Sequence, residues 1–152
     1  MSEWGEQIAA LPLRWDRKGR LQVLMVTSRD TGRWVMPKGW EMDGKKPWAA
    51  AAIEALEEAG VRGHIAREAI GTYTYGKVLD DGSVQPCRVQ LFPMIADKLK
   101  RRWKERKQRK RRWFSIRSAA KRVDEPTLAE LLRSLEDGQF SKGTLRKLCK
   151  AA

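Results

Sequence analysis

The sequence predicts a single mixed α/β domain, in which helices pack on a sheet. Short apolar segments separated by turns occupy the first quarter of the chain, a helix-like segment follows, and strand-like segments then precede an amphipathic end. The chain has 152 residues, an ordinary length for one domain. We therefore expect residues 1–152 to form one unit.

The first segments predict three strands. Ile8–Trp15 and Leu21–Thr27 are apolar and flank the charged turn at residues 16–20, as in a strand, a turn and a strand. Arg33–Met36 predicts a third short strand, which should end at Pro37 because proline cannot donate to a sheet.

A helix is predicted over Pro47–Ala59. Proline suits the first position of a helix, and Gly60 supplies a left-handed stop. Glu54, Glu57 and Glu58 are three and four residues apart, so at 100° per residue they project within an arc of about 100°. The helix should therefore carry one carboxylate face.

Further strands and two helices complete the prediction. Strands are expected near residues 64–69, 72–77 and 84–96, and at Arg112–Phe114. Helices begin at about residue 115, with a short one to about 123 and a longer one from Pro126 to about Glu136. Four leucines, at 128, 131, 132 and 135, give the longer helix an apolar stripe.

The positive charge is concentrated in one segment. The chain has 32 Lys and Arg against 19 Asp and Glu, a net charge of +13. Residues 98–112 contain eleven basic residues and one acid, so this predicted loop accounts for +10 of it. A solvated loop, a rim that binds phosphate and a nucleic-acid-binding arm are all compatible with this composition.

Several classes of protein are excluded or disfavoured. The longest stretch without a charged residue is eight residues, too short to cross a membrane. The acidic amino terminus does not resemble a secretory signal, so a cytoplasmic location is expected. His64 is the single histidine, which excludes a Ser-His-Asp triad, and Cys87 and Cys149 lack zinc-ligand spacing. Catalysis would depend on carboxylates, lysines, water or a bound ion.

The carboxylate face has two interpretations. Glu57 and Glu58 lie at the carboxyl end of the helix, where its dipole disfavours negative charge, and residues 47–61 include no base to neutralise them. The repulsion costs only about 1 kcal/mol, so a solvated acidic face is one reading. The other is a site for a hard cation, Mg²⁺ or Mn²⁺, held by oxygen ligands.

The wider spacing points to a known family. Gly39, Glu54, Glu57, Glu58, Gly60 and Val61 match the pattern G-x5-E-x7-R-E-U-x-E-E-x-G-U, where U is aliphatic. The segment therefore resembles the Nudix box, and Trp34–Gly39 and Arg112–Phe114 are similar to the diadenosine and diphosphoinositol polyphosphate hydrolase branch. This resemblance, over about residues 6–136, implies an α/β/α sandwich with a mixed sheet and Mg²⁺-dependent hydrolysis of a phosphoanhydride bond.

The resemblance also implies site residues. Glu57 and Glu58 would ligate the metal, and Glu54 would ligate it or act as the base on the attacking water. The backbone near Gly39 would complete the metal ligands. Glu105, which lies in a segment similar to a later loop of the family, would be a further ligand, or alternatively a local ion-pair partner.

The candidates for substrate binding are Lys38, Trp40, Arg101, Arg102 and Trp103. They lie beside the box or in the basic loop. Each has a simpler alternative, because exposed cations are commonly solvated and a tryptophan more often packs against the protein.

Two positions differ from the box. Lys45 replaces its first glutamate and Ile53 replaces its arginine, so both members of a bracing pair are changed. The expected function is hydrolysis of a small nucleoside- or inositol-linked polyphosphate. A pyrophosphohydrolase acting on the 5′ end of RNA and a non-catalytic RNA or polyphosphate binder are the alternatives. The sequence leaves the oligomeric state open.

Overall fold

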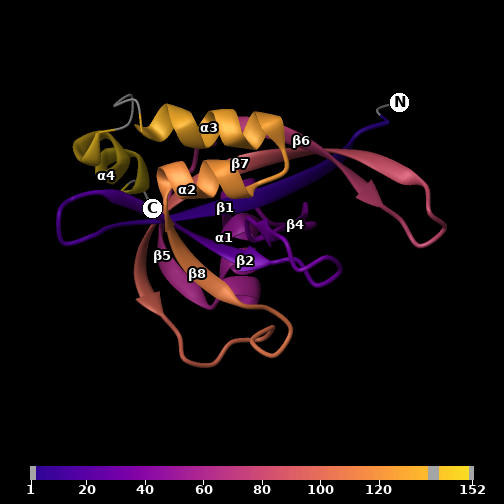
Figure 1. Ribbon diagram of the computed structural model, residues 1–152, viewed down its shortest axis with the longest axis horizontal. Helices are drawn as coiled ribbons and strands as arrows, with labels where there is room; N and C mark the ends of the chain where they lie inside the picture. Colours follow the sequence, from indigo (N-terminus) through magenta and orange to yellow (C-terminus); the bar gives the residue numbers. More distant parts are fainter. Residues whose placement is uncertain (1–2, 137–140, 151–152) are drawn as a thin grey trace.

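Eight strands form one mixed sheet in the computed structural model, which describes residues 3–136 and 141–150 (Figure 1). The central order is β3-β2-β1-β7-β5, while β4 pairs with β1, β6 with β7 and β8 with β2. The long strands β1 and β7 are parallel, and the other pairs are antiparallel. The strands are β1 Gly5–Trp15, β2 Leu21–Thr27, β3 Trp34–Val35, β4 Lys38–Trp40, β5 Val61–Ile65, β6 Gly71–Val78, β7 Val84–Leu99 and β8 Arg111–Ser115.

Each of the two long strands changes its partner at a proline. β1 pairs with β4 up to Ala9 and with β2 from Leu13, and Pro12 lies between these two stretches. β7 pairs with β6 up to Leu91 and with β5 from Met94, and Pro93 lies between them. Proline is tolerated here because the antiparallel ladder on one side of each strand is interrupted, while the parallel β1–β7 ladder continues past both prolines.

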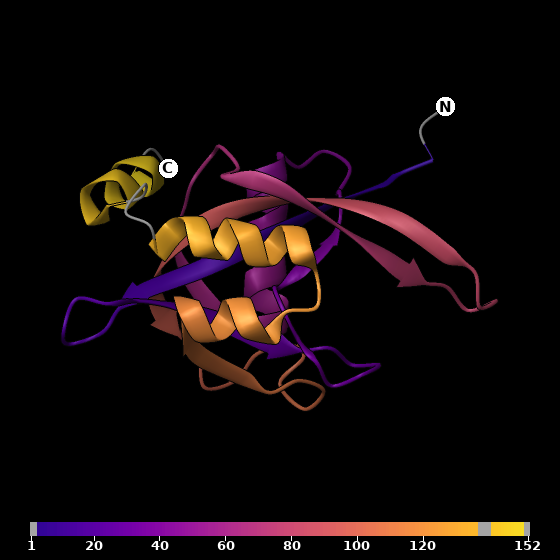
Figure 2. The same cartoon turned by 45° about the horizontal axis from the view of Figure 1, so that its top comes forward.

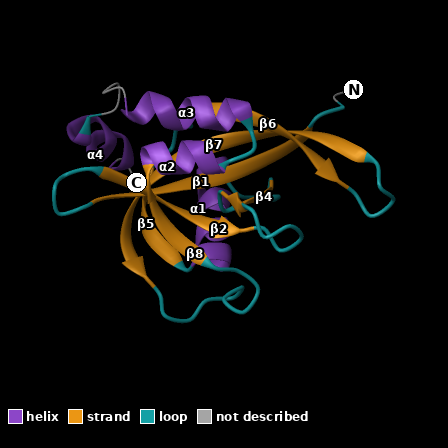
Figure 3. Cartoon of the chain, in the orientation of Figure 1, coloured by secondary structure: helices purple, strands orange, loops and turns teal. Residues whose placement is uncertain are grey.

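Helices cover both faces of the sheet. Helix α1 (Pro47–Glu54) continues into a π-helical turn, η1 (Ala55–Ala59), on one face. Helices α2 (Ile116–Arg122) and α3 (Pro126–Glu136) lie side by side on the other face, as Figure 2 shows, and α4 (Lys142–Lys150) packs near β5 and β7. The secondary-structure colouring of Figure 3 displays the same layers, so the predicted α/β/α sandwich is confirmed.

The core is divided by the sheet into two clusters. Alternate side chains of β1 point to opposite faces. Leu11 and Leu13 pack with Leu132 of α3, whereas Ile8 packs with Ala51 of α1. The alanines of α1 and η1 bring this helix close to the sheet, which fixes the position of the glutamates that follow.

Four local expectations differ from the structure. The strand predicted over residues 64–69 is wrong: β5 begins at Val61, because Gly60 has φ 64° and turns the chain directly into the sheet. The chain also re-enters the sheet as β4 after Pro37, whose carbonyl accepts from the Ala10 amide at 3.0 Å. The helix predicted to run regularly to Ala59 ends in a π-helical turn. Helix α4 has no counterpart in the sequence prediction.

None of the helices in the described part of the chain is both long and apolar enough to cross a membrane.

Candidate active site

A cleft of about 490 Å³ opens where β1, β4 and β6 meet the end of the α1–η1 helix and the loop between β7 and β8. Acidic and basic side chains face each other across it. The carboxylates that line it are Asp30, Glu54, Glu58 and Glu105, and the cations are Arg29, Arg33, Lys38, Lys77 and Arg109.

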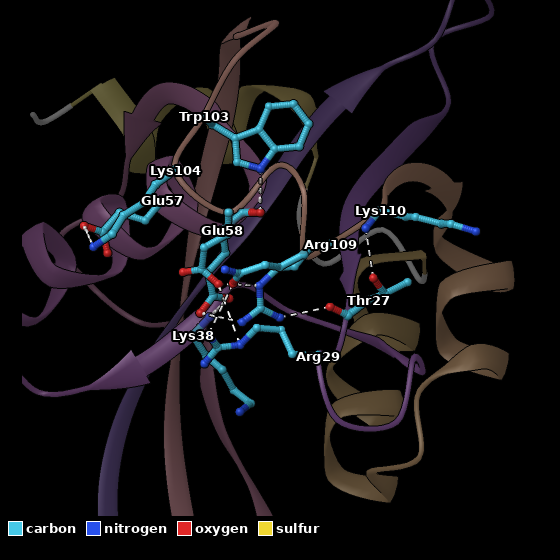
Figure 4. Close-up of polar contacts among 11 residues, drawn as sticks. Thr27, Arg29, Lys38, Glu57, Glu58, Trp103, Lys104, Arg109 and Lys110 are labelled. Carbon is cyan, nitrogen blue, oxygen red and sulfur yellow. Dashed lines mark hydrogen bonds and ion pairs between the residues drawn. The ribbon is translucent and has the colours of Figure 1, made fainter.

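The π-helical turn separates the glutamates of the helix. The Gly60 amide donates to the carbonyls of Ala55 and Leu56, so the turn is wider than an α-helical one and each residue rotates less about the axis. Glu54 and Glu58 line the cleft together. Glu57 is turned away from it, and its Oε2 lies 3.4 Å from Lys104 Nζ (Figure 4).

Glu58 is buried, with 7% of the residue exposed. Its Oε1 accepts from the Lys38 amide at 3.2 Å, and its Oε2 lies 3.4 Å from Arg109 Nη2. Burial raises the pKa of Glu58 to about 7, although Arg109 and the hydrogen bond from Lys38 favour the charged form. The Glu58 carboxylate, which lines the cleft, therefore binds a proton readily at neutral pH.

Glu54 is held against Gly39. A Cβ atom on Gly39 would overlap the Glu54 carboxylate, so this contact requires glycine. Glu54 Oε2 is buried and has no hydrogen-bond partner among the described residues. Burial, followed by the charges of Glu58, Glu57 and Glu105, raises the pKa of Glu54 to about 7. The negative charge of the Glu54 carboxylate is thus poorly compensated by its surroundings.

Arg109 connects the later loop to the helix. Its Nε donates to Glu105 Oε1 at 2.8 Å, its Nη1 donates to the Thr27 carbonyl at 2.9 Å, and its Nη2 faces Glu58. Figure 4 shows the guanidinium directed toward Thr27 and Glu58. Only 9% of the side chain is exposed. Nothing in the sequence distinguishes Arg109 from the other cations of the basic segment.

The same loop is fastened to the end of the π-helical turn. Trp103 Nε1 donates to the Glu58 carbonyl at 3.0 Å, and Arg111 Nη1 donates to the Ala59 carbonyl at 2.9 Å. The Arg111 guanidinium carbon lies 3.9 Å from the centre of the Trp103 ring. Trp103 does not line the cleft, so the structure favours its alternative role of packing on the protein.

Arg101 and Arg102 are exposed on the outside of the loop. They line neither the main cleft nor the smaller one beside it. The basic segment is therefore not one uniform solvated loop. Arg101 and Arg102 are exposed outside both clefts, whereas Arg109 and Arg111 donate hydrogen bonds to backbone carbonyls of other elements.

A chain of polar groups forms another wall. Lys38 Nζ donates to Tyr75 Oη at 2.9 Å, and Tyr75 Oη donates to Gln7 Oε1 at 2.8 Å. Burial lowers the pKa of Lys38. Trp40, at the rim, is 45% exposed. Gln7 and Tyr75 were not predicted from the sequence, because they lie in separate strands with no motif between them.

A second cleft of about 430 Å³ adjoins the first. It shares Ser28, Arg29 and Arg109 with the main cleft, so the two are adjacent. Its remaining cations are Arg106, Lys107 and Lys110, and no aromatic side chain is among its described lining residues. This surface suits phosphate groups better than bases.

The donor set fits a hard divalent cation. Within the described ranges, no three His, Cys, Asp or Glu side chains converge as a ready-made metal cage. However, Glu54 contributes a buried oxygen without a partner, and the carboxylates of Glu58 and Glu105 line the same cleft. Mg²⁺ and Mn²⁺ prefer such oxygen ligands.

The two unusual motif positions lie away from these contacts. Lys45 is exposed and Ile53 is half-buried. A guanidinium nevertheless contacts Glu58, and it comes from Arg109, 51 residues further along the chain. The changed positions are therefore compatible with an assembled cleft.

Comparison with known proteins gives a consistent result. The NUDIX domain model matches residues 5–135. Nudix hydrolase 12, mitochondrial, of Arabidopsis thaliana is 33% identical over 129 residues, which cover 80% of this chain and 64% of that protein. Diphosphoinositol polyphosphate phosphohydrolase 3-alpha of Mus musculus is 31% identical over 137 residues, which cover 88% of this chain and 79% of that one.

Solved structures share the fold. The crystal structure of the C. elegans Ap4A hydrolase has a TM-score of 0.63 at 20% identity, covering 88% of this chain and 97% of that one. A NUDIX hydrolase from Nitrosomonas europaea has a TM-score of 0.68 at 19% identity, covering 90% of each chain.

Proposed function

Because the chain belongs to the NUDIX family, we propose that it is a hydrolase that cleaves a phosphoanhydride bond with the help of Mg²⁺ or Mn²⁺. The observation that supports this proposal is the pairing of Glu54, Glu58 and Glu105 with cations in one cleft. Carboxylates can hold a divalent ion, and cations around them can hold phosphates. We further propose that residues 1–152 act as one domain.

We assign the roles as follows. Glu58, Glu105 and the backbone at Gly39 would hold the cation, which supplies charge that offsets the phosphoryl oxygens. Glu54 would ligate it or accept the proton of the attacking water, because a pKa of about 7 suits a general base at neutral pH. Glu57 remains a proposed ligand from its place in the motif, since its partner Lys104 is 70% exposed and such pairs are weak.

The proposed substrate is a highly anionic small molecule, a nucleoside- or inositol-linked polyphosphate. Lys38, Arg33 and Lys77 line the main cleft, and Arg29 leads from it into the second. Trp40 at the rim offers a face to a base or ring. The printed names of two similar proteins, an Ap4A hydrolase and a diphosphoinositol polyphosphate phosphohydrolase, support this class.

An RNA 5′ pyrophosphohydrolase is the second candidate. The cations of the second cleft continue those of the main cleft, as a phosphate backbone would require. The described lining of the second cleft offers no aromatic side chain on which bases could stack, so we place this candidate second.

The experiment is hydrolysis of a substrate panel with Mg²⁺. We expect release of phosphate or mononucleotide, reduced at least about 100-fold in kcat by Glu58→Gln or Glu54→Gln, since each removes a charge from the reacting centre. Lys104→Gln, outside the cleft, is the control and should keep most of the activity. Full activity in both glutamate variants would contradict the proposal.

The same panel should include 5′-triphosphate RNA at low and moderate salt. A preference for RNA would favour the second candidate, and absence of any Mg²⁺-dependent hydrolysis would favour a non-catalytic binder. A cytoplasmic location remains our proposal, and cell fractionation would test it.

A further inference from the structure

Arg109 contacts two of the carboxylates proposed to hold the metal. Its guanidinium contacts the carboxylates of Glu105, at 2.8 Å, and Glu58, at 3.4 Å. Both carboxylates belong to the proposed metal site, on which this inference rests. A cation that binds the same oxygens would have to share them with the guanidinium or displace it.

The pairing is strong enough to matter because it is shielded from water. The exposed fractions of the side chains are 9% for Arg109, 9% for Glu58 and 16% for Glu105. Charges at such sites are poorly solvated, so leaving either partner unpaired is costly. The nearby Lys104–Glu57 pair, with a lysine 70% exposed, lacks this shielding.

Arg109 is also held from outside the carboxylate cluster. Its Nη1 donates to the Thr27 carbonyl at the end of β2, and its side chain lines both clefts. The guanidinium therefore has a second anchor beside the cationic second cleft. This anchor does not depend on the carboxylates.

We propose that Arg109 is an internal counter-cation that competes with the divalent metal for Glu58 and Glu105. It stabilises the carboxylate cluster when metal is scarce, and it lowers the affinity of the cluster for metal. By reciprocal linkage, a bound metal weakens the hold of Arg109 on these carboxylates. Arg109 is thus a positioning residue that sets the metal concentration at which the site fills.

The test compares Arg109→Gln with Arg106→Gln. Both variants remove one charge from the same loop, but Arg106 is exposed and lines only the second cleft. Mn²⁺ binding is titrated by electron paramagnetic resonance, and thermal unfolding is recorded in EDTA and in Mn²⁺. We expect Arg109→Gln to melt at a lower temperature in EDTA, to bind Mn²⁺ at least about fivefold more tightly, and to gain more stability from Mn²⁺ than the parent.

A purely structural arginine would give a different result. If Arg109→Gln binds Mn²⁺ as well as or more weakly than Arg106→Gln, the competition is refuted while the proposed function stands. If neither the parent nor the variants bind Mn²⁺, the metal assignment fails and this inference fails with it.

Arg109→Lys tests the competition while keeping the charge. Lysine cannot span three acceptors as a guanidinium does. We expect a Mn²⁺ affinity between those of the parent and Arg109→Gln, and an affinity below the parent's would refute the proposal. This variant also keeps the test decisive if the glutamine variant does not fold.

Discussion

Glu54 shows how the fold prepares a single residue for chemistry. One carboxylate oxygen is buried without a partner in the described structure, and the missing Cβ of Gly39 leaves the space that the carboxylate fills. The pKa of about 7 follows from this isolation and from the neighbouring glutamates. Binding a proton or binding a cation would each offset the buried negative charge of Glu54.

The stability of the metal-free protein should depend on pH for this reason. Glu54 and Glu58 have pKa values of about 7 in the folded protein against an ordinary value of 4.5, so the folded state binds more protons between these values. Their contribution is present below about pH 4.5 and is lost as the pH rises through 7. In EDTA, we expect the melting temperature to fall between pH 5.5 and pH 8.5.

Added Mg²⁺ should reverse this loss at pH 8.5 and have little effect at pH 5.5, because it binds the deprotonated groups. Scanning fluorimetry across this range measures both effects. Glu54→Gln should reduce the slope of the profile and leave the contribution of Glu58, whereas Glu130→Gln, an exposed glutamate on α3, should leave the slope unchanged. A profile in EDTA that is flat from pH 5.5 to 8.5 would contradict the expectation.

At the residue scale, the spacing of the sequence motif predicted residues that lie together in the structure. It selected Gly39, Glu54 and Glu58, which the structure brings into one cleft. It did not select Arg109 or Tyr75, whose contacts with Glu58 and Gln7 join distant parts of the chain. Such contacts depend on strand register, which no local pattern determines.

At the scale of elements, the π-helical turn and the loop after β7 form one unit. Residues Ala55–Ala59 end in carbonyls that accept from Trp103 and Arg111, so the loop caps the widened turn. The sequence predicted a helix to Ala59 with Gly60 as its stop, and the turn does end at Ala59. It could not predict the widening, because the apolar pattern of one turn fits either geometry and the cap comes from another part of the chain.

Trp103 should therefore matter for stability more than for substrate binding. Trp103→Ala removes a half-buried ring, its hydrogen bond to Glu58 and the stacking of Arg111, so we expect a loss of about 3 kcal/mol in the free energy of unfolding. Trp103→Phe keeps a ring and loses the hydrogen bond, which should cost about 1 kcal/mol. Urea unfolding measures both.

Trp40→Ala is the matched control, because Trp40 is 45% exposed. Its loss should be about 1 kcal/mol or less. If the Trp40 and Trp103 variants are equally stable, the capping role of Trp103 is wrong.

On the scale of the whole molecule, the cations of residues 98–112 lie in three different environments. The segment 98–112 carries +10 of the net +13. Arg109 and Arg111 are built into the fold, Arg106, Lys107 and Lys110 line the second cleft, and Arg101 and Arg102 lie outside both clefts. Deleting the segment would also remove Glu105, so single charges must be changed instead.

Neutralising the second cleft should weaken binding of a polyanionic substrate. We expect the triple variant Arg106→Gln, Lys107→Gln and Lys110→Gln to raise KM roughly tenfold, to leave kcat nearly unchanged and to reduce the sensitivity of kcat/KM to salt. Steady-state kinetics at two salt concentrations measure these effects.

Lys98→Gln, Arg101→Gln and Arg102→Gln together change the net charge equally, at exposed positions outside both clefts. This second triple should change KM less than threefold. An equal increase in both triples would show that overall charge, and not the cleft, attracts the substrate.

The overall architecture was predictable because it depends on the pattern of apolar residues and of helix start and stop residues along the whole chain. Apolar segments, the Pro47 start, the Gly60 stop and the leucine stripe of α3 together indicated helices packed on a sheet. The family resemblance implied the sandwich with a mixed sheet, which is confirmed. The start of β5 and the pairing of β4 were missed. Both depend on where neighbouring strands lie, which is decided only when the sheet assembles.

The prolines of the two long strands have a further consequence. Pro12 and Pro93 mark the boundary between a half of the sheet with β4 and β6, which carries Lys38 and Tyr75, and a half with β2 and β5, and the β1–β7 ladder joins the two halves across both prolines. The β6–β7 hairpin projects from the first half (Figure 1). Its outer part can change length or composition with little effect on the ladders that follow the prolines.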